Sequence, residues 1–256
     1  MKDNTMSNFE YDYTKWEPKY NFGLQISIAT RGIIDARFMV HMHNVTHNLP
    51  TGFAWRYEFA ISDRKTQSEG THFAFDTDKL RQRLAEDALK TKCKYTLFID
   101  DDVFIPVNGI KRMIRIMEDG KCDVLCGIYW TKSLPPEPVI YKDNCSGPYF
   151  NFPKNKIFKI YSAGLGCCIF KTDILKKIKK PWFKLKWKMK TGKITEYGGS
   201  EDLYFFAKLR KSGIQIWADG AMLCDHLDVK RNIFFPGPEI AKKYTGKGTL
   251  SSIYVG

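Results

Sequence analysis

The segment YTLFIDDDVFIP, residues 95–106, decides the fold that this sequence encodes. Its first five residues form a short, continuous apolar run, which is typical of a strand that is buried on both faces of a sheet. Three carboxylates, Asp100, Asp101 and Asp102, end that run. Open α/β sheets bind their ligands at the carboxyl ends of the strands, so the segment predicts a buried strand that leads directly into a functional site.

Strand-like and helix-like patterns alternate on both sides of this segment. Further strands are expected at 24–30, 53–62, 122–130, 137–142, 157–171 and 214–218. Helices are expected at 33–47, 78–91, 107–118 and 201–212. Alternation of this kind predicts an α/β domain with a mostly parallel central sheet that is flanked by helices.

The composition indicates a folded, basic protein. The chain has 256 residues, of which 43% are hydrophobic, and this content excludes global disorder. It carries 41 Lys and Arg against 28 Asp and Glu, a net charge of +13. Such an excess favours an anionic partner, such as nucleic acid, an acidic membrane or a phosphorylated substrate. We expect a single domain over 21–228, preceded by an N-terminal arm, 1–20, and followed by a C-terminal tail, 229–256.

Cysteine usage and hydropathy indicate a cytoplasmic protein. Seven scattered cysteines without a CxxC pair argue against a disulfide framework and against a structural zinc site. The first residues lack a cationic start followed by an apolar segment, which is the pattern of a secretion signal. No stretch approaches the roughly 18 consecutive apolar residues that a membrane-spanning helix needs.

The three consecutive aspartates predict a metal site. Like charges a few ångströms apart raise one another's pKa unless something neutralises them. A divalent cation is the obvious partner, and Mg²⁺ or Mn²⁺ suits one or two carboxylates, with substrate phosphates completing the coordination. The alternative is an acidic turn that is simply solvated. The position of the cluster after a buried strand favours the metal.

The segment FIDDDVFIP resembles the DxD motif of nucleotide-sugar glycosyltransferases with the GT-A fold, particularly family-2-like enzymes of bacteria and phages. Further elements of that family's pattern follow in the same order, and the resemblance extends over 22–228. These elements are Ser162-Ala163-Gly164-Leu165-Gly166, then Ser200-Glu201-Asp202, then Asp225-His226. The resemblance implies a GT-A (Rossmann-like) domain and a metal-dependent transfer of a sugar from a nucleoside-diphosphate sugar, with a UDP-sugar favoured.

The resemblance also implies the metal ligands. Asp102 matches the position of the direct ligand, and Asp100 that of a residue bound through water or in contact with the ribose. Asp101 is then the variable middle residue, without an assigned role. His226 matches a third ligand, which is chemically reasonable for an imidazole beside an ion of the Mn²⁺ type. The alternative is that His226 is an ordinary histidine whose hydrogen bonds are satisfied within the protein.

Several residues match the donor-binding positions of the family. They lie after the first two strands, on the helix before the DxD strand and in the glycine-containing segment, and they are Thr30, Arg31, Gly32, Asp63, Arg81, Gly164 and Gly166. The resemblance implies that Thr30, Arg31 and Gly32 meet the nucleotide and that Asp63 contacts the base. It also implies that Arg81 lies near the diphosphate. Gly164 and Gly166 would let the sugar lie against the backbone. The alternatives are a solvated helix residue for Arg81 and a bulge or turn for the glycines.

The acidic pair at the start of the last predicted helix matches the catalytic residues. In inverting members of the family, the residue at the position of Asp202 takes the proton of the acceptor hydroxyl, and Glu201 would bind the acceptor. Acidic residues are also common at helix N-termini, where they complement the helix dipole. The two roles are compatible.

A lysine-rich segment, residues 171–193, contains ten lysines and one aspartate, and we expect it to be an insertion on the acceptor side of the domain. In its part 184–190, lysines alternate with apolar residues, so a strand would present Lys184, Lys186, Lys188 and Lys190 on one face. This predicts a polyanionic acceptor.

For the acceptor, we favour a hydroxylated, for example hydroxymethylated, base in phage-type DNA over a lipid-linked or glycan acceptor at a membrane surface. Two other interpretations stay open. The lysines can protect an edge strand against aggregation, and the chain can be a non-catalytic nucleic-acid-binding protein on a degenerate transferase fold.

Overall fold

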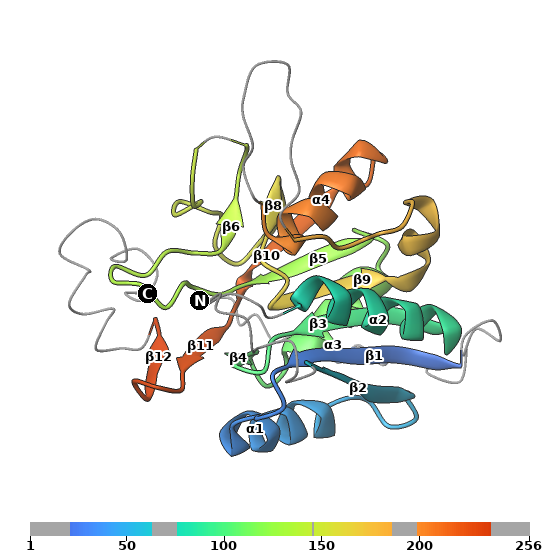
Figure 1. Cartoon of the computed structure of the whole chain (residues 1–256), viewed down its shortest axis with the longest axis horizontal. Coiled ribbons are helices and arrows are strands. Elements are labelled where there is room, and N and C mark those ends of the chain that lie inside the picture. The colour runs from blue at the N-terminus through green and yellow to red at the C-terminus, as the bar shows by residue number, and fades with distance from the viewer. Residues whose placement is uncertain (1–20, 63–75, 145, 186–198, 237–256) are drawn as a thin grey trace, which may run out of the picture.

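A seven-stranded sheet forms the centre of the protein, as a computed structural model of the chain shows (Figure 1). The structure describes residues 21–62, 76–144, 146–185 and 199–236. The strands lie in the order β2 (Trp55–Ile61), β1 (Phe22–Thr30), β3 (Cys93–Ile99), β9 (Cys167–Lys171), β5 (Val124–Ile128), β10 (Ile216–Leu223) and β7 (Ile157–Ile160). Strands β9 and β7 run antiparallel to their neighbours, and the others run parallel to one another. The predicted mostly parallel α/β sheet is therefore confirmed.

Helices cover both faces of this sheet, as predicted. They are α1 (Ala36–His47), α2 (Thr77–Lys90), α3 (Gly109–Glu118) and α4 (Glu201–Lys211), together with a short 3₁₀ helix, η2 (Thr172–Lys177). Apolar residues of α1 and α3 share one buried cluster, and those of α2, α4 and η2 share the other. Strand β3 contributes to both, because Leu97 packs in the first cluster and Phe98 in the second. This is why its sequence is apolar without alternation.

The segment 157–171 was expected to form one strand, and this prediction is wrong. It forms three strands: β7, the two-residue β8 (Ser162–Ala163) and β9. The chain breaks at Gly164-Leu165-Gly166, and β8 turns away to pair with β6 (Ile140–Tyr141). A Cβ atom on Gly164 would lie only 1.9 Å from the hydroxyl oxygen of Tyr129. The glycine therefore permits a close approach of backbone to side chain that ends the strand.

A small second sheet lies beyond the carboxyl end of β3. It consists of β12 (Ile233–Phe235), β11 (Asp225–Asp228) and β4 (Val103–Phe104). His226 of β11 pairs with Val103, the residue that follows the three aspartates. The antiparallel register of β11 and β4 thereby brings His226 beside the end of β3. Residues 233–235 of the expected tail form part of this sheet.

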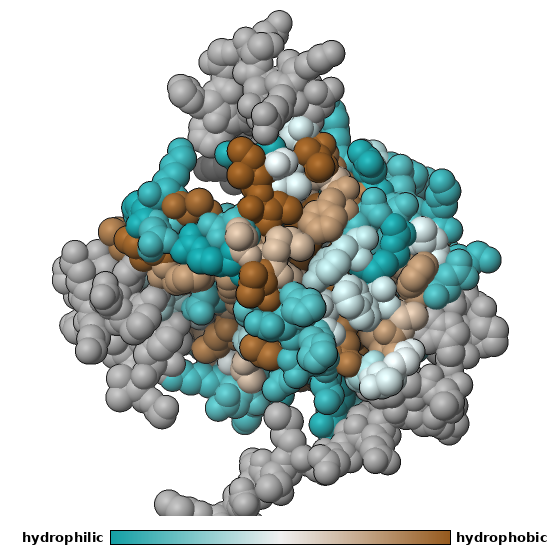
Figure 2. All heavy atoms as spheres, turned by 90° about the horizontal axis from the view of Figure 1, so that it is seen from below, coloured by the Kyte–Doolittle hydropathy of each residue, from teal (hydrophilic) through white to brown (hydrophobic). Residues whose placement is uncertain are grey.

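Apolar side chains are exposed on part of the outer surface. Figure 2 looks at the molecule from below and shows brown apolar residues among teal hydrophilic ones in the described part of the chain. Exposed apolar residues include Ile33, Val40 and Ile61. Single exposed apolar residues are normal on a folded protein. No helix among the described residues has both the length and the apolar character that crossing a membrane requires.

Candidate active site

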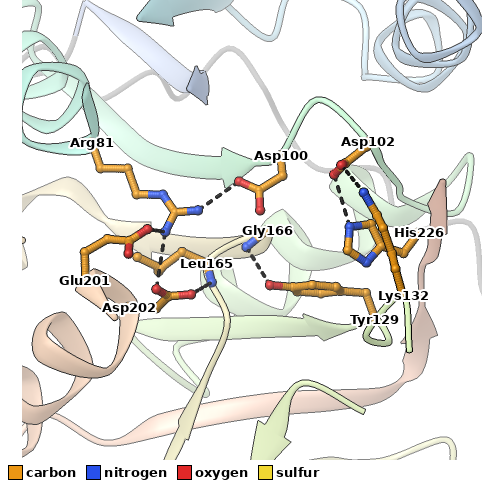
Figure 3. Close-up of polar contacts among 10 residues, drawn as sticks. All are labelled: Arg81, Asp100, Asp102, Tyr129, Lys132, Leu165, Gly166, Glu201, Asp202 and His226. Atoms are coloured by element: carbon orange, nitrogen blue, oxygen red, sulfur yellow. Dashed lines mark hydrogen bonds and ion pairs between the residues drawn. The ribbon is translucent and has the colours of Figure 1, made fainter. Parts of the chain in front are cut away.

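Polar side chains from five separate segments meet at the carboxyl end of β3 (Figure 3). They form two groups. The first, which we call the Arg81 cluster, contains Arg81, Asp100, Glu201 and Asp202. The second, which we call the Asp102 cluster, contains Asp102, Lys132 and His226. Tyr129 lies between the two clusters (Figure 3).

The Arg81 cluster surrounds one buried guanidinium with three carboxylates. Arg81 Nη2 lies 2.8 Å from Asp100 Oδ1, and Nη1 lies 2.5 Å from Glu201 Oε1 and 3.6 Å from Asp202 Oδ1. The Arg81 side chain is only 4% exposed, so its charge depends on these partners. Arg81 therefore ties the end of β3 to the start of α4. It holds acidic side chains in place, whereas the resemblance implied a position near the diphosphate.

Burial raises the proton affinity of two carboxylates in this cluster, those of Glu201 and Asp100. Burial raises the pKa of Glu201 to about 7, against the attraction of Arg81 and with added repulsion from Asp202. Burial also raises the pKa of Asp100, and Asp102 and Asp202 add to this effect while Arg81 opposes it. The cluster thus has carboxyl groups that exchange protons closer to neutral pH than isolated ones do.

Asp202 is the member of the acidic pair that reaches the solvent. Its side chain is 19% exposed, whereas that of Glu201 is 8% exposed. Asp202 Oδ2 accepts a hydrogen bond from the backbone N–H of Leu165 at 3.3 Å. The same carboxylate is therefore oriented from two sides, by Arg81 and by the Gly164–Gly166 segment. An oriented and accessible carboxylate can accept a proton from a substrate hydroxyl.

The Gly164–Gly166 segment packs directly against Tyr129 and Asp100. The backbone N–H of Gly166 donates to the Tyr129 hydroxyl at 3.2 Å. A Cβ atom on Gly166 would lie 2.8 Å from Asp100 Oδ2. Both glycines are thus needed for contacts within the protein itself, which supports the alternative reading of them as a structural turn.

The Asp102 cluster joins a carboxylate to an imidazole and an ammonium group. His226 Nδ1 lies 2.6 Å from the carbonyl oxygen of Trp130, and His226 Nε2 lies 3.2 Å from Asp102 Oδ1. A carbonyl oxygen only accepts hydrogen bonds, so Nδ1 carries a proton. Nζ of Lys132 contacts the other carboxylate oxygen, Oδ2. Burial raises the pKa of Asp102, but its interactions with His226 and with the ammonium group of Lys132 outweigh it, and this pKa lies below its usual value.

Asp102 and His226 fit the ligand set of a divalent cation. A metal-binding imidazole normally donates its other N–H to a carbonyl or carboxylate, as Nδ1 does here to Trp130. Within the described residues, no group of three or more His, Cys, Asp and Glu side chains is arranged to hold a metal ion. Asp100, the other expected ligand, pairs with Arg81 instead. A single protein carboxylate, with water and substrate phosphates completing the coordination, is nevertheless usual for Mg²⁺.

The end of β1 lies beside the same aspartates. Gly32 has a φ of +91° and donates its N–H to Thr30 Oγ1 at 3.2 Å. Burial raises the pKa of Asp101 to about 6, against a hydrogen bond with Thr30. Ile61, at the end of β2, is 57% exposed and would lie 3.2 Å from a Cβ atom on Gly32. Arg31 is exposed at this edge.

Part of the predicted site lies outside the described residues. This applies to Asp63, Lys186, Lys188 and Lys190, whereas Lys184 is described and exposed. Conversely, the structure adds Lys132 and Tyr129, which the sequence did not single out. Tyr129 lies inside a predicted strand, and Lys132 lies just after it, where no motif marks either of them.

Comparisons with known proteins bear on the fold. No family model matches the sequence, and no curated protein matches it either. The structure is similar to that of A197 from STIV, with a TM-score of 0.54 and 18% identity over 80% of this chain and 85% of that one. It is also similar to GalNAc-T7 with UDP, GalNAc and Mn²⁺, with a TM-score of 0.50 and 10% identity over 87% of this chain.

The second match covers less than half of the other protein, because this chain spans 47% of the GalNAc-T7 chain. S. aureus TarS 1–349 in complex with UDP-GlcNAc gives a TM-score of 0.43 and 13% identity over 78% of this chain and 57% of that one. At identities this low, the structural similarity shows a common fold and nothing about activity. The chain therefore has a GT-A-like fold, with its two polar clusters at the carboxyl end of the central strand.

Proposed function

We propose that the protein is a metal-dependent glycosyltransferase that moves a sugar from a nucleoside-diphosphate sugar to a hydroxyl group of an anionic acceptor. One observation carries this proposal: the Asp102–His226 pair and the acidic start of α4 lie at the same edge of a GT-A-like sheet. Glycosyl transfer needs a group that neutralises the leaving diphosphate and a group that activates the acceptor. The two clusters supply candidates for these two tasks.

The donor side consists of the Asp102 cluster and the end of β1. Asp102 and His226 would hold Mn²⁺ or Mg²⁺, which neutralises charge on a departing diphosphate when it is bound. Asp100 remains a candidate for contact with the cation through water or with the ribose. Gly32 lies beside the exposed side chain of Ile61 at this edge, and a nucleobase is proposed to pack against the two. Asp63 and Arg31 are proposed contacts of the nucleotide, and a UDP-sugar is the favoured donor.

The acceptor side consists of Asp202 and its supports. Asp202 is proposed to take the proton of the acceptor hydroxyl, because it is the accessible carboxylate of its cluster. Arg81 and Glu201 are positioning residues, since both are buried and bonded to one another. The N–H of Leu165 orients Asp202 from the opposite side. This assignment applies to a reaction that inverts the configuration of the sugar.

The acceptor is proposed to be a polyanion, with a hydroxylated base in DNA favoured. The support comes from charge: ten lysines lie within 171–193. Several of them are exposed in the described part, namely Lys176, Lys177, Lys179, Lys180 and Lys184. Lysines that pair with DNA phosphates release counter-ions and give an affinity that depends on salt. Lipid-linked and glycan acceptors, and binding of nucleic acid without catalysis, are the alternatives that the experiment must separate.

The first experiment measures thermal unfolding with UDP, GDP, ADP and CDP, each with and without Mn²⁺. A ligand that binds only the folded protein raises its melting temperature by mass action. We expect UDP with Mn²⁺ to give the largest rise, and no response to any nucleotide would contradict the proposal. Hydrolysis of UDP-sugars that depends on Mn²⁺ would then exclude a purely binding protein.

The second experiment addresses the acceptor. The variant with Lys184, Lys186, Lys188 and Lys190 changed to Gln is compared with the unchanged protein in binding DNA and anionic vesicles. For a DNA acceptor, the slope of log affinity against log salt should fall by about 0.9 for each lost phosphate contact. Loss of vesicle binding with unchanged DNA binding would favour a lipid-linked acceptor.

A further inference from the structure

We propose that Lys132 is a built-in counter-ion of Asp102 that makes the donor's diphosphate and the divalent cation bind cooperatively. This inference rests on the proposed function, because it assigns to Lys132 a task in binding the same donor. In the absence of donor, the ammonium group neutralises Asp102 and competes with the cation. When the diphosphate arrives, the ammonium group moves to it and leaves Asp102 to the cation.

The contacts of Asp102 are the first support. His226 Nε2 lies 3.2 Å from Oδ1, while Nζ of Lys132 contacts Oδ2. Both carboxylate oxygens of Asp102 therefore already have a partner. A cation that binds Asp102 would have to displace one of these partners or share the carboxylate with it. The side chains of Lys132 and Asp102 are 28% and 24% exposed, so both are accessible from the solvent.

The backbone of Lys132 is fixed from two sides. The loop that contains it is closed by hydrogen bonds of 2.8 Å from Thr131 N to the Glu137 carbonyl and of 2.9 Å from Glu137 N to Thr131 Oγ1. The carbonyl oxygen of Lys132 accepts a hydrogen bond from Arg231, which also pairs with Asp228 at 2.6 Å. A lysine has a flexible four-carbon stem. Its ammonium group can therefore move between neighbouring anions while its backbone stays in place.

The charges explain why the two ligands would help each other. An ammonium group on Asp102 repels an incoming divalent cation and competes for the same oxygen. A diphosphate offers several oxygens to an ammonium group, and charge-assisted hydrogen bonds of this kind are strong. Once Lys132 has moved, the Oδ2 atom of Asp102 is free for the cation. Coupling between two ligands is reciprocal, so the cation must strengthen diphosphate binding by the same factor.

Arg81, the residue that the sequence suggested for the diphosphate, is a poor candidate for this task. Its side chain is 4% exposed, and its guanidinium already contacts Asp100, Glu201 and Asp202. Lys132, by contrast, is accessible and lies on the carboxylate that the cation would use. The geometry thus assigns the movable positive charge to Lys132 and the fixed one to Arg81.

The test measures binding, without transfer activity. Mn²⁺ is titrated into the full chain by calorimetry at fixed pH, with and without UDP, and UDP is titrated with and without Mn²⁺. The variants are Lys132→Gln, Lys132→Arg and the control Lys230→Gln, which removes an exposed charge from the turn after β11. Lys132→Met serves as a second neutral variant, and circular dichroism confirms that each variant is folded.

In the unchanged protein, UDP should raise the affinity for Mn²⁺ by about tenfold or more. Lys132→Gln should bind Mn²⁺ more tightly in the absence of UDP, bind UDP more weakly in the absence of Mn²⁺, and lose most of the coupling. Lys132→Arg should retain part of the coupling, and Lys230→Gln should behave like the unchanged protein.

Unchanged Mn²⁺ affinity and unchanged coupling in both neutral variants would overturn the role of Lys132, while the proposed function would stand. Failure of the unchanged protein to bind UDP under any condition would instead contradict the proposed function. The arm with Mn²⁺ alone still tests Lys132 in that case, because competition for Asp102 does not require a nucleotide. If Mn²⁺ binds neither the unchanged protein nor the neutral variants, both proposals fail.

Discussion

The guanidinium of Arg81 lies 2.5 Å from the carboxylate of Glu201, and this contact joins two helices through residues that are 120 positions apart in the chain. Arg81 belongs to α2, and Glu201 is the first residue of α4. The start of α4 is therefore held over the end of β3 by a buried ion pair. Since Asp202 follows Glu201 directly, the orientation of the proposed base depends on this contact.

Replacement of Arg81 by Met should destabilise the protein strongly. It would leave three carboxylates without their cation, and loss of one partner of a buried pair typically costs about 3–5 kcal/mol. Urea unfolding at pH 7 measures this cost, which should shrink at low pH as the carboxylates become protonated. The control Arg83→Met removes an exposed arginine of the same helix and should change stability by no more than about 0.5 kcal/mol. Equal effects of the two changes would contradict the structural role of Arg81.

The raised pKa of Glu201 should be visible in the dependence of stability on pH. A carboxyl group whose pKa is higher in the folded state binds its proton more tightly there, so its contribution is complete below the unfolded pKa and is lost as pH rises. For Glu201 the window runs from its usual value of 4.5 to about 7. Glu201→Gln should flatten the fall of unfolding free energy across this window, an effect of up to about 3 kcal/mol.

Glu86→Gln is the matched control for that measurement. The hydrogen bond from Lys180, together with one from Gln82, lowers the pKa of Glu86, so its contribution has the opposite sign and is present above its unfolded pKa. This change should leave the fall of stability between pH 4.5 and 7 in place. A Glu201→Gln profile parallel to that of the unchanged protein would mean that the Glu201 carboxyl is not perturbed by its surroundings.

The central strand and its carboxylates were predictable because their signal is local. A strand buried on both faces has an apolar run, and β3 has one from Tyr95 to Ile99. The small-residue segment that ends at Gly166 was recognised as a motif, but it was placed inside one long strand. The close contact of Gly164 with Tyr129, which ends that strand, lies between residues 35 positions apart and leaves no local pattern.

The partners of the aspartates could not be predicted for a similar reason. The sequence suggested that Asp100 and Asp102 lack positive neighbours, whereas Arg81 and Lys132 neutralise them. The acidic side chains that Arg81 meets depend on how α2 packs on the sheet. The position of Lys132 depends on a loop that Arg231 holds from a distant part of the chain. Contacts of this kind follow from tertiary structure and not from composition or periodicity.

Replacement of Gly164 by Ala should destabilise the protein by about 1–3 kcal/mol, the usual cost of forcing extra volume into a packed site. The new Cβ atom would lie 1.9 Å from the hydroxyl oxygen of Tyr129. Removal of that oxygen by Tyr129→Phe should recover part of the loss. A double-mutant cycle measured by urea unfolding should therefore give a non-additive term of about 0.5 kcal/mol or more. Strictly additive effects would mean that the hydroxyl does not set the need for glycine.

Replacement of Asp102 by Ala should abolish the dependence of UDP binding on Mn²⁺. The change removes the carboxylate of the proposed cation site while His226 remains. Its cost to stability should be about 1 kcal/mol or less, because the pair with Lys132 is partly exposed and such pairs contribute little. Asp123→Ala, which removes a carboxylate paired with Lys171, serves as the control and should leave UDP binding unchanged. The same Mn²⁺ dependence in Asp102→Ala would contradict the assignment of the metal site.

Replacement of Asp202 by Asn should separate catalysis from binding. Asn keeps an oxygen that can accept the N–H of Leu165, so the local structure should persist, but it cannot take a proton from the acceptor. General-base assistance typically contributes a factor of about 10²–10⁴, and transfer should fall by that factor while the affinity for UDP with Mn²⁺ stays the same. Asp173→Asn, which changes an exposed carboxylate of η2, should leave both quantities unchanged. Transfer by Asp202→Asn at nearly the original rate would exclude Asp202 as the base and favour a reaction that retains the configuration of the sugar.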